Sequence, residues 1–253
     1  MYLSIFIKNI REYQPKFWWL HLILPILLAI FMLFLYPITG LDGLFIQSFY
    51  DANSLRFPLK QDWFLENIMH VSLKYLVVII ALGLFIFWIF GLKILVLKSK
   101  TFNTRCLQIY HQHFIWVFIA MLITTTAISV LKHMSNHACP WNLLIYGGDQ
   151  PLLALFEALP IGATAGHCFP GGHASGGFAL MAFYFGFKDT NAKVANIKLA
   201  NLGLFIGLSL GFAMGWAQMM RGAHFMSHNL WTAWIVWMLL LVQYLLWKPA
   251  IKE

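Results

Sequence analysis

The stretch RGAHFMSHNLW, residues 221–231, places an arginine and two histidines between two long apolar segments. Ionisable groups at the edge of a membrane-length apolar segment are costly, and they usually mark a functional site. The combination of Arg221, His224 and His228 suits chemistry on an anion. A guanidinium binds oxygens in a fixed geometry, and imidazoles exchange protons near neutral pH.

Two other segments carry residues of the same kind. Lys132 directly follows one uncharged run, and the segment PGGH precedes another. In PGGH, Gly171 and Gly172 leave backbone N–H groups open at the expected start of a helix, where the helix dipole also favours an anion. His173 is expected in the first turn of that helix.

Together these residue types suit a reaction at a phosphate. We expect His224 to attack phosphorus as a covalent nucleophile and His173 to act as a general acid. Cations and backbone N–H groups would bind the phosphoryl oxygens, namely Lys132, Arg221, Gly171 and Gly172. This arrangement requires no metal and no other cofactor.

The elements that must position these residues are membrane helices. The chain has 253 residues, of which 60% are hydrophobic and 10% charged, and its mean hydropathy is +0.73. Soluble domains carry about 25% charged residues, and a membrane span needs about 20 mostly apolar residues. Five uncharged runs come close to that length: Phe17–Tyr36, Tyr75–Leu92, Phe114–Leu131, Leu199–Met220 and Asn229–Trp247.

A sixth run, Ala174–Phe187, is shorter and follows a weakly polar segment, residues 163–173. The sequence therefore predicts an all-α polytopic bundle of six transmembrane helices. We expect a single integral membrane domain over residues 1–253, with the catalytic motifs within residues 132–231.

Basic residues divide unevenly between the two sides of this bundle. With the N-terminus inside, most lie in inner segments: Lys8, Arg11, Lys16, Lys93, Lys98, Lys100, Arg105, Lys188, Lys193, Lys198, Lys248 and Lys252. This positive-inside pattern explains the net charge of +8 without a nucleic-acid partner. Both termini are expected to be cytoplasmic, and Lys132, His173 and His224 then share the outer face.

Cysteine, glycine and the remaining histidines give further expectations. Cys139 and Cys168 share one outer loop, where they either pair, if that side is oxidising, or remain two free, half-buried thiols. Glycine recurs every fourth residue from 203 to 215, which favours close helix packing.

The stretch LDGLFIQSFY predicts a helix at the membrane interface. Four histidines are expected to be interfacial: His21, His70, His111 and His113.

The segment from Lys132 to Trp231 resembles the type 2 phosphatidic acid phosphatase family. That family has three motifs: Lys, six residues, Arg-Pro; Pro-Ser-Gly-His; and Ser-Arg, five residues, His, three residues, Asp. In the first motif Lys132 and Pro140 match, but Cys139 stands where the family has arginine. In the second, His173 matches the general acid and Gly171 replaces serine.

The third motif allows two registers. In the one we favour, His224 is the nucleophile, His228 occupies the aspartate position, and Gln218 occupies the arginine position. Arg221 is one helical turn from Gln218 and would supply the guanidinium. In the other register Arg221 pairs with His228, and Thr232 fills the aspartate position.

The resemblance implies a metal-independent phosphatase that cleaves a lipid phosphate mono- or diphosphate ester through a phosphohistidine. It also implies a site at the outer face, and we expect a bacterial inner membrane protein. Asp149, in the outer loop, is a candidate for the missing carboxylate. The oligomeric state is left open.

Three alternatives use the same residues differently. A phosphotransferase would pass the phosphoryl group to another lipid, and a catalytically degraded relative would only bind lipid phosphates. A membrane metalloenzyme would use His224 and His228 at the i, i+4 spacing of zinc ligands. Against that reading, Phe225 stands where a zinc protease carries its glutamate base.

Overall fold

The computed structural model describes residues 13–96, 102–188 and 196–249. Within these ranges the chain is helical, with two isolated β-bridges and no β-strand. The all-α fold predicted from the sequence is therefore confirmed. Six of the predicted inner basic residues lie outside the described ranges: Lys8, Arg11, Lys98, Lys100, Lys193 and Lys252.

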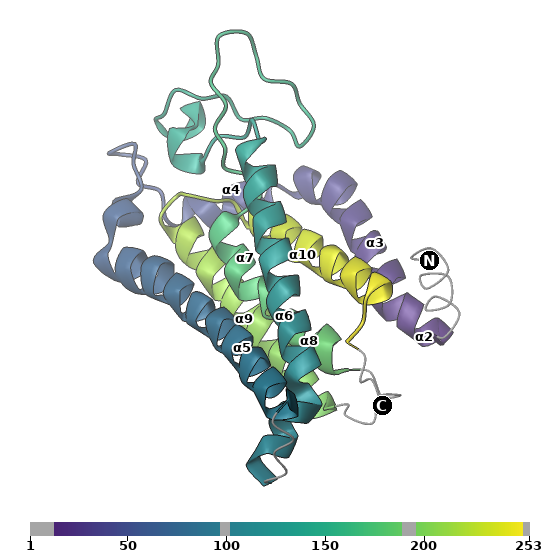
Figure 1. Cartoon of the computed structure of the whole chain (residues 1–253). Coiled ribbons are helices and arrows are strands. Elements are labelled where there is room, and N and C mark those ends of the chain that lie inside the picture. The colour runs from purple at the N-terminus through teal and green to yellow at the C-terminus, as the bar shows by residue number, and fades with distance from the viewer. Residues whose placement is uncertain (1–12, 97–101, 189–195, 250–253) are drawn as a thin grey trace.

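Five helical segments of the described chain are long and apolar enough to cross a membrane, by length and composition. They are Pro15–Thr39, Phe64–Lys93, Tyr110–His133, Ile197–Met220 and Met226–Leu246. Their main helices are α2 (Pro15–Trp18), α3 (Leu24–Ile30), α5 (Leu73–Val96), α6 (Phe102–His133), α9 (Ile197–Met220) and α10 (Met226–Leu246) (Figure 1). These segments cover the five long uncharged runs, and they are typical of an integral membrane protein.

The predicted sixth helix is broken into two short helices. α7 (Gly172–Ala179) and α8 (Ala182–Phe187) are joined by a turn at Leu180 and Met181. The N–H of Leu180 donates to the Gly177 carbonyl at 3.1 Å, so the backbone stays bonded through the turn. Such a break is tolerated because this element is enclosed by protein and does not face lipid.

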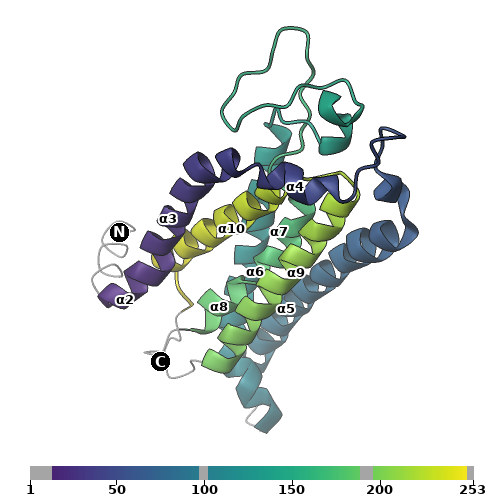
Figure 2. The ribbon, with the colours of Figure 1, turned by 180° about the vertical axis from the view of Figure 1, so that it is seen from behind.

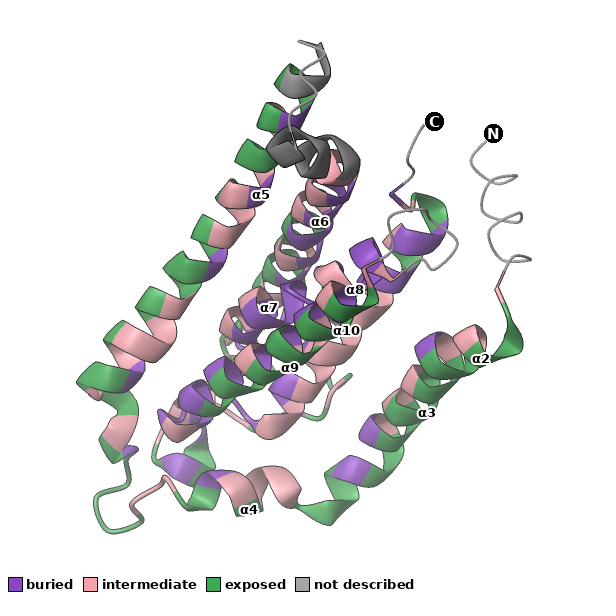
Figure 3. Ribbon diagram, turned by 90° about the horizontal axis from the view of Figure 1, so that it is seen from below, coloured by how far each residue is buried: buried purple, intermediate pink, exposed green. Residues whose placement is uncertain are grey.

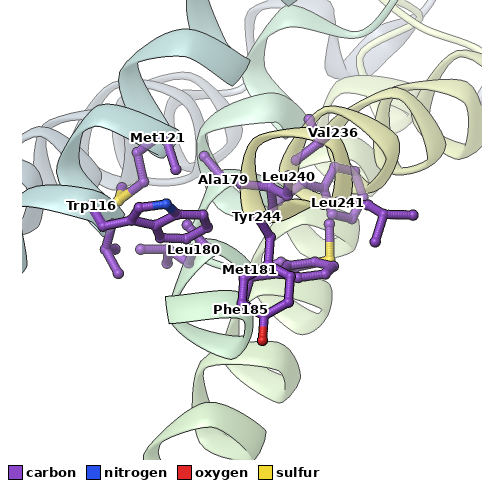
Figure 4. Close-up of a cluster of buried hydrophobic side chains, with 14 of the residues drawn as sticks. Trp116, Met121, Ala179, Leu180, Met181, Phe185, Val236, Leu240, Leu241 and Tyr244 are labelled. Atoms are coloured by element: carbon purple, nitrogen blue, oxygen red, sulfur yellow. The ribbon is translucent and has the colours of Figure 1, made fainter. Parts of the chain in front are cut away.

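The broken element forms the centre of the bundle. α6, α9 and α10 all contact α7 and α8 (Figures 1 and 2). The apolar core lies where these helices meet: Figure 4 shows Trp116 of α6 and Phe185 of α8 beside Leu240 and Tyr244 of α10. Burial of these side chains holds the short helices in place, since burying apolar surface is the main favourable contribution to packing.

The first span lies at the edge of the bundle. Only 11% of the most apolar 18-residue stretch of this span is buried, against 39% for the corresponding stretch of α10. Exposed residues dominate α2 and α3 in Figure 3. Two indole N–H groups of α10 attach it. Trp234 donates to the Pro25 carbonyl at 2.8 Å, and Trp237 donates to the His21 carbonyl at 3.0 Å.

Two of the histidines expected at the interface are buried instead. His21 is 4% exposed, and its Nε2 lies 2.7 Å from the Tyr184 hydroxyl. His113 is 1% exposed, and its Nδ1 lies 2.6 Å from the Gly186 carbonyl. The prediction was wrong for both because α8 supplies their polar partners inside the bundle.

The connecting segments differ modestly from expectation. The predicted interfacial helix is present as α4 (Leu41–Gln47). The second span begins earlier than predicted, with the π-helical segment η5 (Phe64–Ser72), so the preceding outer loop is shorter. Short 3-10 turns complete the loops: η3 (Tyr36–Thr39), η4 (Pro58–Gln61), η6 (Pro140–Asn142) and η7 (Leu144–Tyr146).

The glycine repeat of α9 packs as predicted. A Cβ added to any of its four glycines would lie 2.2 to 2.7 Å from another atom. The positions are Gly203, Gly207, Gly211 and Gly215. Their neighbours belong to α7, α8, the turn between these two helices, and α10, so the repeat allows α9 to approach the buried element closely.

We predict that Gly177→Ala destabilises the protein by about 1–3 kcal/mol, the usual range for overpacking. A Cβ at Gly177 would lie 2.4 Å from the backbone nitrogen of Gly211, which a side-chain movement cannot relieve. Gly83→Ala in α5 is the control, because nothing lies within 4 Å of its added Cβ. Thermal unfolding in detergent should show a lower midpoint for the first variant only. Equal midpoints would contradict the close packing.

Candidate active site

The predicted site residues gather at one end of the bundle. α6 and α9 end there, and α7 and α10 begin there (Figures 1 and 2). Lys132 belongs to the last turn of α6, and His173 is the second residue of α7. Arg221 follows the last residue of α9, and His224 lies in the short loop before α10. Sequence-distant segments therefore bring these side chains to one face.

His224 and His228 form a buried pair. Their Nδ1 atoms are 3.3 Å apart, and the two residues are 2% and 5% exposed. A neutral imidazole has one N–H and one acceptor nitrogen, so one ring must donate to the other. If His224 donates, its Nε2 keeps a free lone pair, as a nucleophile requires.

The surroundings of His224 favour its neutral form. Burial holds the pKa of His224 well below its ordinary value, and the nearby His228, Lys132 and His173 lower it further. The imidazole is therefore uncharged at neutral pH.

Lys132 lies over the start of α7. A Cβ built on Gly172 would be 3.3 Å from Lys132 Cδ and 3.6 Å from its Nζ. A larger residue at 172 would therefore push the ammonium group away. Glycine at this position lets a cation and the positive end of a helix face the same space, which suits an anion.

Arg221 is buried and already has three partners. Its Nε donates to the Lys60 carbonyl at 2.9 Å, Nη1 lies 3.3 Å from His70 Nδ1, and Nη2 lies 3.5 Å from a carboxylate oxygen of Glu66. A guanidinium has five N–H groups, so two remain for an anion. Gln218, at the arginine position of the third motif, is buried, and its Nε2 has no hydrogen-bond partner among the described residues.

A groove runs from this site into the membrane region between α5 and α6. Its cavity volume is about 740 Å³. The polar end is formed by Lys74, Lys132, His133, His167 and His173. The apolar walls are formed by Val77, Val78, Ala81 and Leu82 of α5 and by Phe118, Met121 and Leu122 of α6.

The groove is long and open towards the lipid side. Phe118 and Lys132 are fourteen residues apart on α6, which is about 21 Å at the helical rise. Val78, Leu82 and Leu122 line the groove and are also 44%, 51% and 54% exposed. An apolar chain can therefore reach the polar end from the surrounding membrane.

Comparison with protein families matches the PAP2 superfamily to residues 114–252, more than half of the chain. The chain belongs to the PAP2 superfamily. Its members are generally phosphatases, commonly acting on lipid phosphates. No curated protein and no solved structure matches the chain. The matched range contains all three motif segments, and the resemblance to type 2 phosphatidic acid phosphatases is confirmed.

The glycine that replaces serine in the second motif of this PAP2 protein is closely packed. A Cβ at Gly171 would lie 2.9 Å from Oδ1 of Asn229, so a serine there would require the Asn229 side chain to move. The N–H of Gly171 donates to Thr232 Oγ1 at 2.8 Å. Of the two predicted glycine amides, Gly171 is thus already bonded to α10, which leaves Gly172 as the one directed to an anion.

The cysteine in the first PAP2 motif is covalently bonded. Cys139 and Cys168 form a disulfide, with Cα atoms 5.1 Å apart. The sulfur of Cys168 lies 3.7 Å from His224 Nδ1 and 3.0 Å from the Ala223 carbonyl oxygen. The disulfide therefore joins the first- and second-motif loops directly beside the predicted nucleophile, where the family has an arginine.

No carboxylate contacts either imidazole of the pair among the described residues. Asp149 is exposed, and its carboxylate accepts from the Gln150 side chain at 3.1 Å. Asp42 of α4 instead accepts from the backbone N–H of Ser227 at 2.8 Å and from its hydroxyl. Asp42 thus caps the start of α10 and fixes the turn next to His228.

One residue of the site, His70, was not predicted from the sequence. His70, expected at the interface, makes a short Nε2–Nε2 contact with His173. It lies in η5, outside the range matched to the PAP2 superfamily. A signal was present, because Glu66 and His70 are spaced i, i+4 near the start of the second span, where they share one helix face.

We predict that removing the disulfide, in a Cys139→Ala, Cys168→Ala double variant, lowers stability by about 2–4 kcal/mol. Activity should fall as well, because the disulfide packs against His224. Thermal unfolding and phosphate release check both effects, and a reductant should reproduce them in the unmodified protein. Cys106→Ala is the control, since Cys106 is outside this pair. An unfolding midpoint that does not change when the reductant is added would contradict the prediction.

Proposed function

We propose that this PAP2 protein is a metal-independent lipid phosphatase that works through a phosphohistidine. His224 attacks phosphorus with Nε2, and the bond between phosphorus and the leaving oxygen breaks. His173 assists the leaving oxygen, by donating a proton to an alkoxide or a hydrogen bond to a phosphate. Water then attacks phosphorus, the phosphorus–nitrogen bond breaks, and inorganic phosphate leaves.

The residues around the reacting atoms have separate roles in this proposal. Lys132, the Gly172 amide and the two remaining N–H groups of Arg221 bind phosphoryl oxygens. His228 accepts the Nδ1 proton of His224, which orients the nucleophile as the family's aspartate would. Unlike an aspartate, a neutral His228 supplies no negative charge. Gly171 contributes indirectly, by joining the start of α7 to Thr232.

The observation that carries the proposal is the continuity between the cationic site and the apolar groove. Lys132 and His173 line both. A ligand that fits this shape has an anionic head and at least one long apolar chain, which describes a lipid phosphate. A soluble phosphate ester would leave the apolar walls between α5 and α6 without a partner.

The disulfide supports the proposed orientation. Disulfides persist in oxidising compartments, and Cys139 and Cys168 lie at the same end of the bundle as the site. We therefore infer that the site faces the non-cytoplasmic side, with both termini cytoplasmic. We also propose the bacterial inner membrane as the location, as expected from the sequence.

The first test is phosphate release from a panel of lipid phosphates in detergent. His224→Ala and His173→Ala should each lower kcat by about 100-fold or more, the lower range for removing a catalytic proton-transfer group. Product analysis separates a hydrolase from a phosphotransferase, which would form a second phosphorylated lipid. Binding that survives His224→Ala without any phosphate release would instead show a lipid-phosphate-binding protein.

We predict that Ala81→Trp, which fills the groove, raises KM for a long-chain lipid phosphate at least about 10-fold. Loss of that much binding equals roughly 1.4 kcal/mol, less than full burial of one large apolar side chain. Hydrolysis of p-nitrophenyl phosphate should change little. Ile79→Trp is the matched control, because Ile79 is on the same helix, 64% exposed and outside the groove. Equal effects of both variants would reject the groove as the lipid site.

A further prediction concerns the imidazole pair His224 and His228. His228→Leu should lower kcat by roughly 100-fold, because His224 loses the acceptor that fixes its tautomer, an effect that reaches about 10⁴-fold in a serine protease. His228→Asn should keep most activity, since its side-chain oxygen can accept near the position of Nδ1. Steady-state kinetics measures the effect, and unchanged thermal unfolding midpoints show that both variants are folded. Similar rates for both variants would show that the acceptor is unimportant.

A further inference from the structure

A chain of polar contacts leads from the protein surface to His173. Glu66 pairs with Arg221, Arg221 Nη1 lies 3.3 Å from His70 Nδ1, and His70 Nε2 contacts His173 Nε2. The other ring nitrogen of His173, Nδ1, is buried without a hydrogen-bond partner among the described residues. His173 also lines the groove.

The chemistry of arginine determines where the protons lie. A guanidinium only donates, so His70 Nδ1 must be the acceptor in its contact with Arg221. The single proton of a neutral His70 is then on Nε2, and it is donated to His173. His173 Nε2 must accept it, which places the proton of His173 on Nδ1.

This arrangement also keeps His173 uncharged. A protonated His173 would carry hydrogens on both nitrogens, so two donors would face each other unless His70 moved its own proton to Nδ1. A proton on His70 Nδ1 would then face an N–H of Arg221, which also can only donate. Lys74 and Lys132 line the groove together with His173 and add positive charge there, and Glu66 is already paired with Arg221.

An uncharged His173 can donate a hydrogen bond through its one N–H, but that N–H is too weak an acid to transfer its proton at neutral pH. An alkoxide leaving group needs a proton at neutral pH, since alcohols resemble water, whose pKa is about 15.7. A phosphate leaving group does not, because its second pKa is about 6. The site therefore suits a substrate whose leaving group is itself a phosphate.

The polar end of the groove supports the same conclusion independently. Besides Lys132, it contains Lys74, and none of the described residues that line the groove is acidic. Lys74 is contributed by α5 and Lys132 by α6, so two different helices each bring a lysine to one groove. One phosphoryl group needs only one of these sites, whereas a diphosphate can use both.

We propose that His70 is a positioning residue that, with Arg221, holds His173 as the uncharged Nδ1–H form, and that the substrate is a lipid diphosphate. This rests on the proposed function. His224 Nε2 bonds to the terminal phosphorus as the bridging phosphorus–oxygen bond breaks. The lipid monophosphate leaves with the electron pair and needs no proton, while His173 Nδ1–H bonds to the bridging oxygen. Water then attacks phosphorus and the phosphorus–nitrogen bond breaks. Both protons of the water stay on the released phosphate.

The deciding experiment compares farnesyl diphosphate with farnesyl monophosphate, which share one apolar chain. Purified protein in detergent should give a kcat at least about 100-fold higher with the diphosphate, the lower range for a general-acid contribution that only the monophosphate requires. Equal rates, or faster release from the monophosphate, overturn the inference. If neither substrate releases phosphate, or release survives His224→Ala, the proposed function itself fails.

Variants of His70 separate positioning from a structural role. His70→Gln can accept from Arg221 through its oxygen and donate to His173 through its nitrogen, so the diphosphate preference should persist. His70→Leu frees His173 Nε2 to hold a proton, so the preference should shrink at least about 10-fold, part of the same general-acid range. An equal loss on both substrates would indicate a structural role only.

Lys74 has a matched control on its own helix. Lys74→Gln should lower kcat/KM for farnesyl diphosphate about 10-fold, the effect of losing one charged contact, and should change the monophosphate value far less. Lys93→Gln, an exposed lysine at the other end of α5, should change neither. Equal effects of Lys74→Gln on both substrates would remove the second phosphate site.

The tautomer can be measured without any turnover. The ¹⁵N spectrum of His173, assigned by comparison with His173→Ala, should show the proton on Nδ1 in the unmodified protein and in His70→Gln. In His70→Leu it should no longer be confined to Nδ1. A proton on Nε2 of His173 in the unmodified protein overturns the inference even if diphosphates are hydrolysed.

Discussion

Two imidazoles inside an apolar bundle must satisfy each other, and the site is arranged around that requirement. The Nδ1 atoms of His224 and His228 are 3.3 Å apart, and both rings are almost fully buried. Burying a polar group without a partner costs free energy, so each ring holds the other in one orientation. Burial also keeps His224 neutral, and this leaves one ring nitrogen with a lone pair, as the proposed attack on phosphorus requires.

The departures from the PAP2 motifs are connected by packing. Gly171 in place of serine makes room for Asn229, whose side chain also fills the space above Gly215. Cys139 in place of arginine is bonded to Cys168, whose sulfur lies against His224. Each change thus has a neighbour that depends on it.

Charge is supplied to this site from elements outside the three motifs. Arg221 belongs to the third-motif segment, but two of its partners, Glu66 and His70, are contributed by η5 of the second span. Asp42 of α4 caps α10 beside His228 without touching the imidazoles. The N-terminal half of the chain therefore positions a site whose motifs lie entirely in the other half.

Much of the molecule was determined by consecutive residues alone. The lengths of the apolar runs predict five spans, the four-residue glycine repeat predicts the close packing of α9, and the positions of Lys132, His173 and His224 at run ends predict a shared face. These features depend on local periodicity and helix length, which neighbouring residues decide. The likeness to a phosphatase family was also readable from motif spacing.

Tertiary structure decided the remainder. The break between α7 and α8, the disulfide, the bonded amide of Gly171 and the place of His70 depend on which helices pack together. His70 and His173 are 103 residues apart in the chain, so no local pattern connects them. Proton positions on buried imidazoles follow from the groups that face them, and only the packed bundle brings those groups into contact.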